Sequence, residues 1–286
     1  MDYSNPELPE GINTSKEHPL KEFFILTAGI LALVFIVIST LILLVDNFAD
    51  KIPFELENEL PVTSIIKYEQ AEKLPPYLEK VTHKVLKSFE LPEEIKITFH
   101  YVNDDTVNAF ATLGGHIVLY RGLIEKLKHE EELAMVIAHE IAHIKYRHPI
   151  MSASHGIVVG IVLTALNSTS GNSIVSDLMG TTGTATLMKF SRDFEYQADK
   201  DAINSLIKLY GHAEGALGLF KVFEEEQGNQ LNFEFLATHP LTDNRISQTT
   251  RMINANPNKQ SHTMRAYPDS FKEWLKIQKE KTDESK

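Results

Sequence analysis

Two histidines and a glutamate lie close together in one apolar stretch of the chain. His139, Glu140 and His143 interrupt residues 131–144, which contain no glycine or proline and begin with acidic residues. On a helix, His139 and His143 project from the same face and can bind one ion, while Glu140 can reach a water on that ion. This H-E-x-x-H pattern is typical of zinc peptidases. Burying three polar groups in an apolar helix without a function would be unfavourable, which also favours a metal site.

A catalytic zinc site has three protein ligands, and this chain contains no cysteine to supply a thiolate. Glu195 lies on the next strongly helical segment, and Asp199 follows it four residues later on the same face. If Glu195 completes the coordination, Asp199 can accept a hydrogen bond from the free ring nitrogen of a ligand histidine, or take part in proton delivery. From the spacing alone, a solvated glutamate on a helix surface is the alternative for Glu195.

Composition and one apolar run bound the class of protein. The chain has 286 residues and a formal net charge of -11, which argues against a nucleic-acid partner. Residues 23–45 carry no charge and are long enough to cross a bilayer as a helix. The run is longer than the apolar core of a signal peptide, so we expect a retained anchor. Lys16 and Lys21 precede it and Lys51 follows it, which favours a body outside the cytoplasm.

The body of the chain is predicted to be a mostly α-helical α+β domain. Helices are expected over residues 77–89, 131–144, 184–208, 213–226 and 241–254, with the helical part of the chain beginning at 122–128. Alternating residues predict a strand at 95–102. Residues 107–112 and 116–120, on either side of a Gly-Gly turn, predict a β-hairpin or two strands of a small sheet. Residues 156–166 are apolar but too short to span a bilayer, so we expect a core helix, with a segment in the membrane interface as the alternative.

Several short motifs follow one another between residues 74 and 251. They are Asn108-Ala109-Phe110-Ala111, Gly114-Gly115-His116-Ile117, Arg121-Gly122-Leu123, the H-E-x-x-H sequence, Ser191-Arg192 with Glu195 and Asp199, and Thr238-His239-Pro240 with Arg245. This order resembles the HtpX, Oma and CAAX-prenyl-protease family of membrane-associated zinc metallopeptidases. A set of motifs in register is far more specific than H-E-x-x-H alone.

The resemblance implies a zincin-like fold of the gluzincin type with one Zn²⁺ per chain. It implies that His139, His143 and Glu195 are the zinc ligands, and that Glu140 is the general base. Gln197 stands where the family usually has a glutamate. That position is not a ligand in the family pattern, so the departure does not affect the expected zinc site.

The resemblance also implies how a substrate is bound. Asn108, Ala109 and Phe110 begin a strand that resembles the family's substrate edge strand, which pairs with an extended peptide through backbone hydrogen bonds. His239 is the candidate oxyanion donor, with Arg245 in support. Two alternatives remain open for His239: it caps the helix that follows Pro240, or it fills the open position of zinc at rest.

These inferences divide the chain into five segments. They are a flexible polar tail (1–22), a transmembrane helix (23–45), a linker (46–74), a zinc metallopeptidase domain (75–256) and a charged carboxyl-terminal tail (257–286). We expect a single-pass inner-membrane zinc endopeptidase that cleaves unfolded or misassembled envelope or membrane proteins, a quality-control role that rests on the resemblance alone. The alternative is a chaperone-like assembly factor that binds extended clients with little or regulated proteolysis. The oligomeric state is left open.

Overall fold

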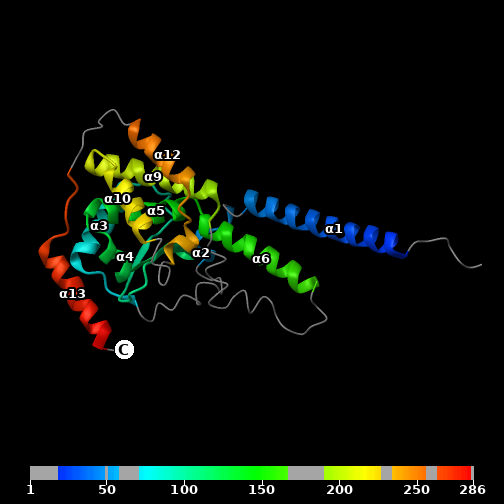
Figure 1. Cartoon of the computed structure of the whole chain (residues 1–286), viewed down its shortest axis with the longest axis horizontal. Coiled ribbons are helices and arrows are strands. Elements are labelled where there is room, and N and C mark those ends of the chain that lie inside the picture. Colours follow the sequence, from blue (N-terminus) through cyan, green and yellow to red (C-terminus); the bar gives the residue numbers. More distant parts are fainter. Residues whose placement is uncertain are drawn as a thin grey trace, which may run out of the picture.

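A computed structural model describes the fold for residues 19–48, 51–57, 71–166, 190–226, 234–255 and 263–284. The expectations for the polar tail, for the linker and for the start of the helix at 184–208 lie wholly or partly outside these residues. The helices are α1 (Pro19–Phe48), α2 (Phe54–Glu57), α3 (Pro76–Leu86), α4 (Arg121–Lys126), α5 (Glu130–Lys145), α6 (His148–Leu166), α9 (Arg192–Tyr210), α10 (Glu214–Glu226), α11 (Phe235–Thr238), α12 (Asp243–Asn254) and α13 (Asp269–Glu284). The strands are β1 (Ala71–Glu72), β2 (Thr98–Val102), β3 (Ala109–Thr112) and β4 (His116–Tyr120). The predicted α+β, mostly helical architecture is confirmed (Figure 1).

The strands form one four-stranded sheet in the order β1-β2-β4-β3, with β3 at an edge. β3 and β4 pair antiparallel, which confirms the predicted hairpin, whereas β2 pairs parallel with β4. The turn between β3 and β4 depends on glycine, because Gly114 and Gly115 have φ angles of 72° and 77°. A Cβ atom on Gly115 would also collide with the carbonyl oxygen of Lys96. At this edge of the sheet, β3 packs against helix α5.

Helix α5 runs through the middle of the domain, with α3, α9 and α10 packed around it and β3 against it (Figure 1). All its residues from Glu131 to Ile144 are buried. The Glu132 carboxylate caps its start by accepting from the backbone N–H of His129 at 3.0 Å. α10 approaches so closely that a Cβ atom on Gly215 would overlap the carbonyl oxygen of Glu131. The polar residues of α5 are thus held inside a packed core.

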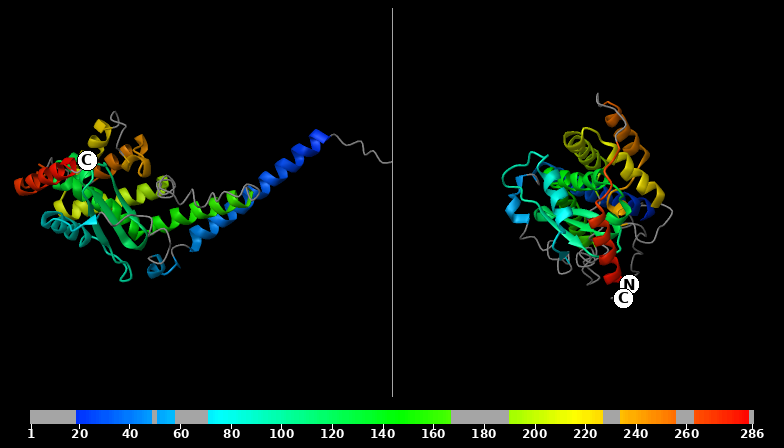
Figure 2. Two further views of the ribbon diagram at one scale, coloured as in Figure 1. Left: turned by 90° about the horizontal axis from the view of Figure 1, so that it is seen from below. Right: turned by 90° about the vertical axis from the view of Figure 1, so that its left-hand side faces the viewer.

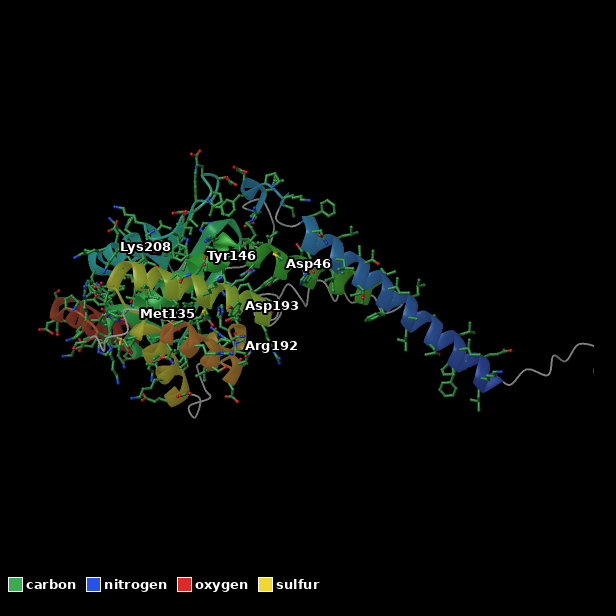
Figure 3. The ribbon with its side chains drawn as sticks, turned by 90° about the horizontal axis from the view of Figure 1, so that it is seen from above. Asp46, Met135, Tyr146, Arg192, Asp193 and Lys208 are labelled. Carbon is green, nitrogen blue, oxygen red and sulfur yellow. The ribbon has the colours of Figure 1, made fainter. Side chains whose placement is uncertain are left out.

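Helix α1 is exposed and apolar, and residues 20–48 are long and apolar enough to cross a membrane. Within the described part of the chain it is the one helix that meets this criterion. The segment at 156–166 was expected to be a core helix, but α6 does not enter the domain core. It begins in a small apolar cluster with Leu113 and Val45 and then runs beside α1 (Figures 1 and 2). Asp46 lies at this junction (Figure 3), where its Oδ1 is 2.8 Å from Nε2 of His155.

Within the segment expected as a charged carboxyl-terminal tail at 257–286, the structure has the helix α13, which packs on the domain. Phe271 and Leu275 are buried on this helix, and Trp274 lies against Phe271 and Tyr101 with ring centroids 5.8 Å and 5.1 Å apart. These apolar residues recur at spacings of three and four, so they form one face of an amphipathic helix. The many charges of this segment occupy the other face, which is why composition alone was misleading.

Candidate metal centre

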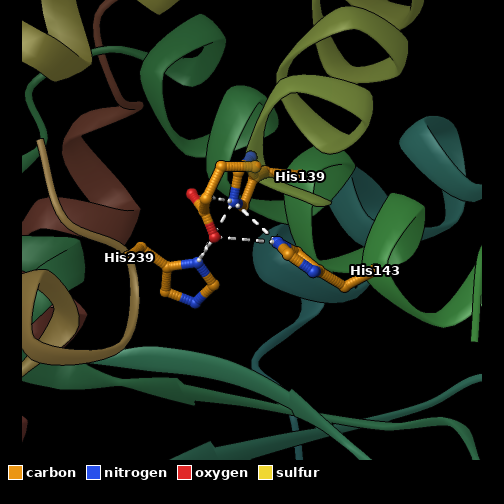
Figure 4. A group of neighbouring side chains, drawn as sticks. His139, His143 and His239 are labelled. Atoms are coloured by element: carbon orange, nitrogen blue, oxygen red, sulfur yellow. Dashed lines mark hydrogen bonds and ion pairs between the residues drawn. The ribbon is translucent and has the colours of Figure 1, made fainter. Parts of the chain in front are cut away.

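Four donor atoms converge inside the domain (Figure 4). They belong to His139 and His143 of α5, Glu195 of α9, and His239 directly after α11, and all lie within 4.8 Å of one another. His143 Nε2 is 3.0 Å from His139 Nε2, and Oε1 of Glu195 is 2.9 Å from Nδ1 of His239. Each of these four residues is at most 2% exposed. The structure therefore brings the three predicted ligands and His239 to one point.

Glu195 reaches this point because of how α9 begins. The Ser191 side chain caps the helix by accepting from the backbone N–H of Phe194 at 3.2 Å. Glu195 follows in the first turn, and α9 packs along α5 more extensively than any other described pair of elements does. Its carboxylate then lies against both histidines, with Oε2 3.5 Å from His139 Nε2 and Oε1 3.5 Å from His143 Nε2. It is buried, and not a solvated helix-surface glutamate.

His139 is supported by charged groups. Its Nδ1 is 3.0 Å from Oδ1 of Asp199, so His139 is the histidine that Asp199, expected to contact one of the two, actually meets. Burial alone would lower the pKa of His139, but hydrogen bonds to Asp199 and Glu195 outweigh it and raise this pKa to about 10. A metal ion that binds here must displace a proton from the His139–Asp199 pair, so metal affinity falls as pH falls.

Arg245 completes this charged side of the centre. Its guanidinium donates to both carboxylate oxygens of Asp199, each at 2.8 Å, and lies 2.6 Å from Oε2 of Glu195. Burial would raise the pKa of the Asp199 carboxyl, but the charge of Arg245 and the contact with His139 lower it overall. Arg245 was expected to support the oxyanion donor. Its side chain fixes two carboxylates of the centre, and its Nη1 also donates to the backbone carbonyl of His239 at 3.3 Å, so it contacts the loop that carries His239 as well.

His143 is supported by neutral groups to which the sequence analysis gave no function. Nδ1 of His143 is 3.0 Å from Nδ1 of His148, and Nε2 of His148 is 3.0 Å from Oε1 of Gln197. The His143 ring also stacks on Phe190, with centroids 4.0 Å apart. Burial lowers the pKa of His143 well below its ordinary value and that of His148 to about 4. The only signal in the sequence was a histidine five residues after His143, just past the end of the helix.

Glu140 lies at the centre with no exposed surface. Neither of its carboxylate oxygens has a hydrogen-bond partner of normal geometry in the described part of the chain, and Oε1 is 3.6 Å from Nε2 of His239. Burial raises the pKa of Glu140, while the charges of His239 and His139 oppose the rise. A buried carboxylate without partners is unfavourable unless it serves a reactant.

The predicted substrate residues lie on the sheet edge next to this centre. Ala109 is buried and Phe110 half-buried in β3, and the Asn108 side chain donates to Glu234 at 3.3 Å. The backbone N–H of Ala111 in the same strand lies close to the Glu140 carboxylate and opposes the rise in its pKa that burial causes. The edge strand and the buried carboxylate are therefore neighbours.

The donor set fits a divalent metal ion. Imidazole nitrogen and carboxylate oxygen are ligands that zinc and other first-row divalent ions accept, and four donors suit a tetrahedral site. The unpartnered oxygens of Glu140 lie beside these donors, where a polar reactant would satisfy them. The chain's own residues thus supply both a metal-binding group and an uncommitted carboxylate.

Comparisons with known proteins agree with this geometry. The chain is 31% identical over 176 residues to a beta-barrel assembly-enhancing protease of Yersinia pestis, covering 56% of this chain and 35% of that protein. It is 27% identical over 174 residues to the Escherichia coli K12 protein of the same name, again covering 56% of this chain and 35% of that protein. To the mitochondrial metalloendopeptidase OMA1 of Saccharomyces cerevisiae it is 25% identical over 211 residues, covering 66% of this chain and 61% of that protein.

The chain thus spans about a third of the length of the two bacterial relatives. The family model described as Peptidase family M48 matches residues 72–253, which is more than half of the chain and contains every donor of the centre. The resemblance stated from the motifs is therefore confirmed, and this chain belongs to peptidase family M48.

Proposed function

We propose that this chain is a zinc-dependent endopeptidase. The observation that carries the proposal is the burial of Glu140, with two unpartnered oxygens, beside four converging donor atoms. His139, His143 and Glu195 would hold one Zn²⁺ per chain. When bound, zinc would polarise the scissile carbonyl and lower the pKa of water. A site with this composition supports hydrolysis of a peptide bond.

In this proposal Glu140 is the general base. It takes a proton from the attacking water and delivers it to the nitrogen of the leaving amine. Its raised pKa makes it a stronger base than an exposed carboxylate, and its burial excludes competing bulk water. Asp199 keeps the His139 ring in one orientation, so that Nε2 faces the other donors.

His239 has two possible functions, and its position favours one of them. Nδ1 of His239 is 2.9 Å from Oε1 of Glu195 and 3.3 Å from Nε2 of His139, so it lies among the donor atoms. This supports the capping function at rest over the oxyanion function. The loop would then have to move before a substrate carbonyl could approach, which makes His239 a gate of the proposed site.

The substrate is proposed to be an extended polypeptide segment. β3 is the edge strand of the sheet and contacts α5, so a peptide that adds to this edge would run past Glu140. Backbone pairing predicts weak sequence preference, which suits unfolded or misassembled proteins. The names of the relatives, an assembly-enhancing protease and a mitochondrial metalloendopeptidase, support clients of the envelope or membrane.

The proposed location is a membrane, with residues 23–45 as the anchor and residues 75–256 as the peptidase domain. The exposed apolar surface of α1 supports the anchor, because such a surface is unfavourable in water. The charge bias around the span favours an extracytoplasmic domain. This orientation can be tested by fusing to the carboxyl end a reporter that is active only in the cytoplasm. Activity of the fused reporter would exclude an extracytoplasmic domain.

The experiment that tests the catalytic proposal is cleavage of casein by the full chain in detergent. We expect cleavage that stops when a chelator removes zinc, returns when zinc is restored, and is slower in Glu140→Gln by about 10²–10⁴-fold. Cleavage that continues at the same rate in Glu140→Gln and in the presence of the chelator would contradict the proposal. Binding of casein without any cleavage would instead favour the chaperone-like function.

A further inference from the structure

His148 lies in an unusual position for a buried histidine. It is 1% exposed, and its two ring nitrogens contact two different polar groups: Nδ1 of His143 on one side and Oε1 of Gln197 on the other, both at 3.0 Å. Neither His148 nor Gln197 belongs to the donor cluster. Together they connect a donor of the cluster to the protein surface, where Gln197 lies.

These contacts allow one arrangement of protons. His143 Nε2 faces the other donor atoms, so it must carry the lone pair and Nδ1 must carry the proton. Nδ1 of His143 then donates to Nδ1 of His148, which has to accept. Nε2 of His148 therefore carries the second proton and donates to Oε1 of Gln197. A neutral imidazole thus does for His143 what the Asp199 carboxylate does for His139.

The turn that precedes His148 is held in a conformation that few residues adopt. Arg147 has a φ angle of 60°, the one positive φ at a non-glycine residue in the described part of the chain. Its Nε donates to Oε1 of Glu57 at 2.7 Å, and its guanidinium also donates to the carbonyl of Ile52 at 2.8 Å. These contacts stabilise the turn from α5 into α6. Because of this turn, His148 points back at the ring of His143.

The His148 ring is also fixed from its faces. It stacks on Phe194 of α9 with centroids 4.1 Å apart and an interplanar angle of 10°, and Tyr146 lies near-parallel to it at 5.6 Å. Next to these aromatic rings, an apolar side chain would pack as well as an imidazole. Packing therefore does not explain why a histidine stands here, whereas hydrogen bonding to His143 does.

We propose that His148, oriented by Gln197, is a positioning residue that fixes the tautomer and ring orientation of His143 for metal binding. This inference rests on the proposed function, because it assigns His148 a task at the proposed metal centre. It adds a neutral support to the charged support of His139. The group that faces Nε2 of His148 is the side-chain amide of Gln197. Its oxygen can only accept a hydrogen bond, which suits a His148 ring that donates through Nε2.

The test compares two variants of nearly the same shape, His148→Asn and His148→Leu. Asn retains an acceptor close to the position of Nδ1, whereas Leu has none. Zinc affinity of the full chain in detergent is measured by competition with a chelator of known affinity. We expect the Leu variant to bind zinc about 10–100-fold more weakly than the Asn variant. If His148 only fills space, the Leu variant binds at least as tightly, and that result overturns the proposal.

A second substitution keeps the test decisive if the Leu variant does not fold. Gln197→Met retains length and removes the acceptor of His148, and we expect a smaller loss because water can partly replace this surface amide. Gln197→Met should have little further effect in a His148→Asn background, since the ring that it orients is then absent. Additive losses would overturn the proposal. Absence of zinc binding in the unaltered chain would overturn the proposed function itself, so the two failures are distinguishable.

Discussion

Two histidines one turn apart on α5 are supported by opposite kinds of neighbour. His139 contacts the Asp199 carboxylate, and its pKa is raised to about 10. His143 contacts the neutral His148 ring, and burial lowers its pKa well below the ordinary value. If both bind the metal as proposed, His139 must first lose a proton because its pKa is raised. His143 is already neutral and oriented. Two histidines on the same face of one helix can thus have pKa values shifted in opposite directions.

Replacing the group shared by both histidines should have the largest effect. Glu195 lies 3.5 Å from each of them, so Glu195→Ala removes a proposed ligand from both sides of the comparison. We expect zinc affinity to fall by more than about 100-fold, beyond the range of losses for an outer partner, and cleavage to disappear. Metal analysis and casein turnover measure this. Full zinc content with normal turnover would mean that another group is the third ligand.

Replacing Glu140 should slow the reaction without disturbing the residues that support His139 and His143. No hydrogen bond joins the Glu140 carboxylate to Asp199 or His148. In Glu140→Gln we expect cleavage to fall by about 10²–10⁴-fold while the chain still binds one zinc ion. Single-turnover rates together with metal analysis check this. Loss of zinc in this variant would show that Glu140 belongs to the metal-binding group and is not the base.

Removing the charge of Asp199 tests directly whether His139 and His143 differ in protonation. Asp199→Asn keeps a carbonyl oxygen near His139 but removes the charge that raises its pKa. We expect zinc affinity to fall by about 10–100-fold. Zinc affinity of the unaltered chain should rise with pH up to about pH 10, because binding displaces the His139 proton, and the rise should be shallower in the variant. Chelator competition between pH 7 and pH 9 measures both. An unchanged slope would break the distinction between the two histidines.

The smallest effect is expected at His239, which lies outside both supports. If it caps the site at rest, His239→Ala should raise casein turnover or self-cleavage by roughly 2–10-fold, because the open state becomes more populated. Zinc affinity should fall slightly. If His239 donates to the oxyanion instead, turnover should fall by about 10²–10³-fold. Unchanged turnover would exclude both functions of His239, and the helix that follows Pro240 would not explain the residue either, because Thr242 caps that helix by accepting from the backbone N–H of Arg245 at 3.3 Å.

The sequence predicted the parts of the centre that follow from local periodicity. The faces of α5 and α9 depend on i, i+4 spacing, which is why a hydrogen bond between Asp199 and one of the two histidines could be expected, although the spacing did not say which histidine. The hairpin was readable from Gly114 and Gly115, because few other residues adopt their backbone conformation. Local rules of this kind describe one helix or one turn at a time.

The remaining features depend on contacts between distant segments. His148 reaches His143 through the left-handed turn at Arg147, which is held by Glu57, ninety residues earlier in the chain. No local pattern encodes that arrangement. Arg245 was expected only to support His239, because its carboxylate partners on α9 become neighbours only when α9 and α12 pack together. The buried face of α13 was not predicted, because charged residues dominate the composition of this helix.

The pairing of α6 with α1 has a consequence for reach. His155 pairs with Asp46, the first residue after the apolar run, and His148 touches the metal centre seven residues earlier on the same helix. At about 1.5 Å per residue, this interval along α6 is roughly 10 Å. If residues 23–45 cross a bilayer, the scissile bond must therefore come within a thin layer above the lipid surface. Such an enzyme would search for clients by diffusing in two dimensions, and it would sample the stretches of protein that emerge directly from the membrane.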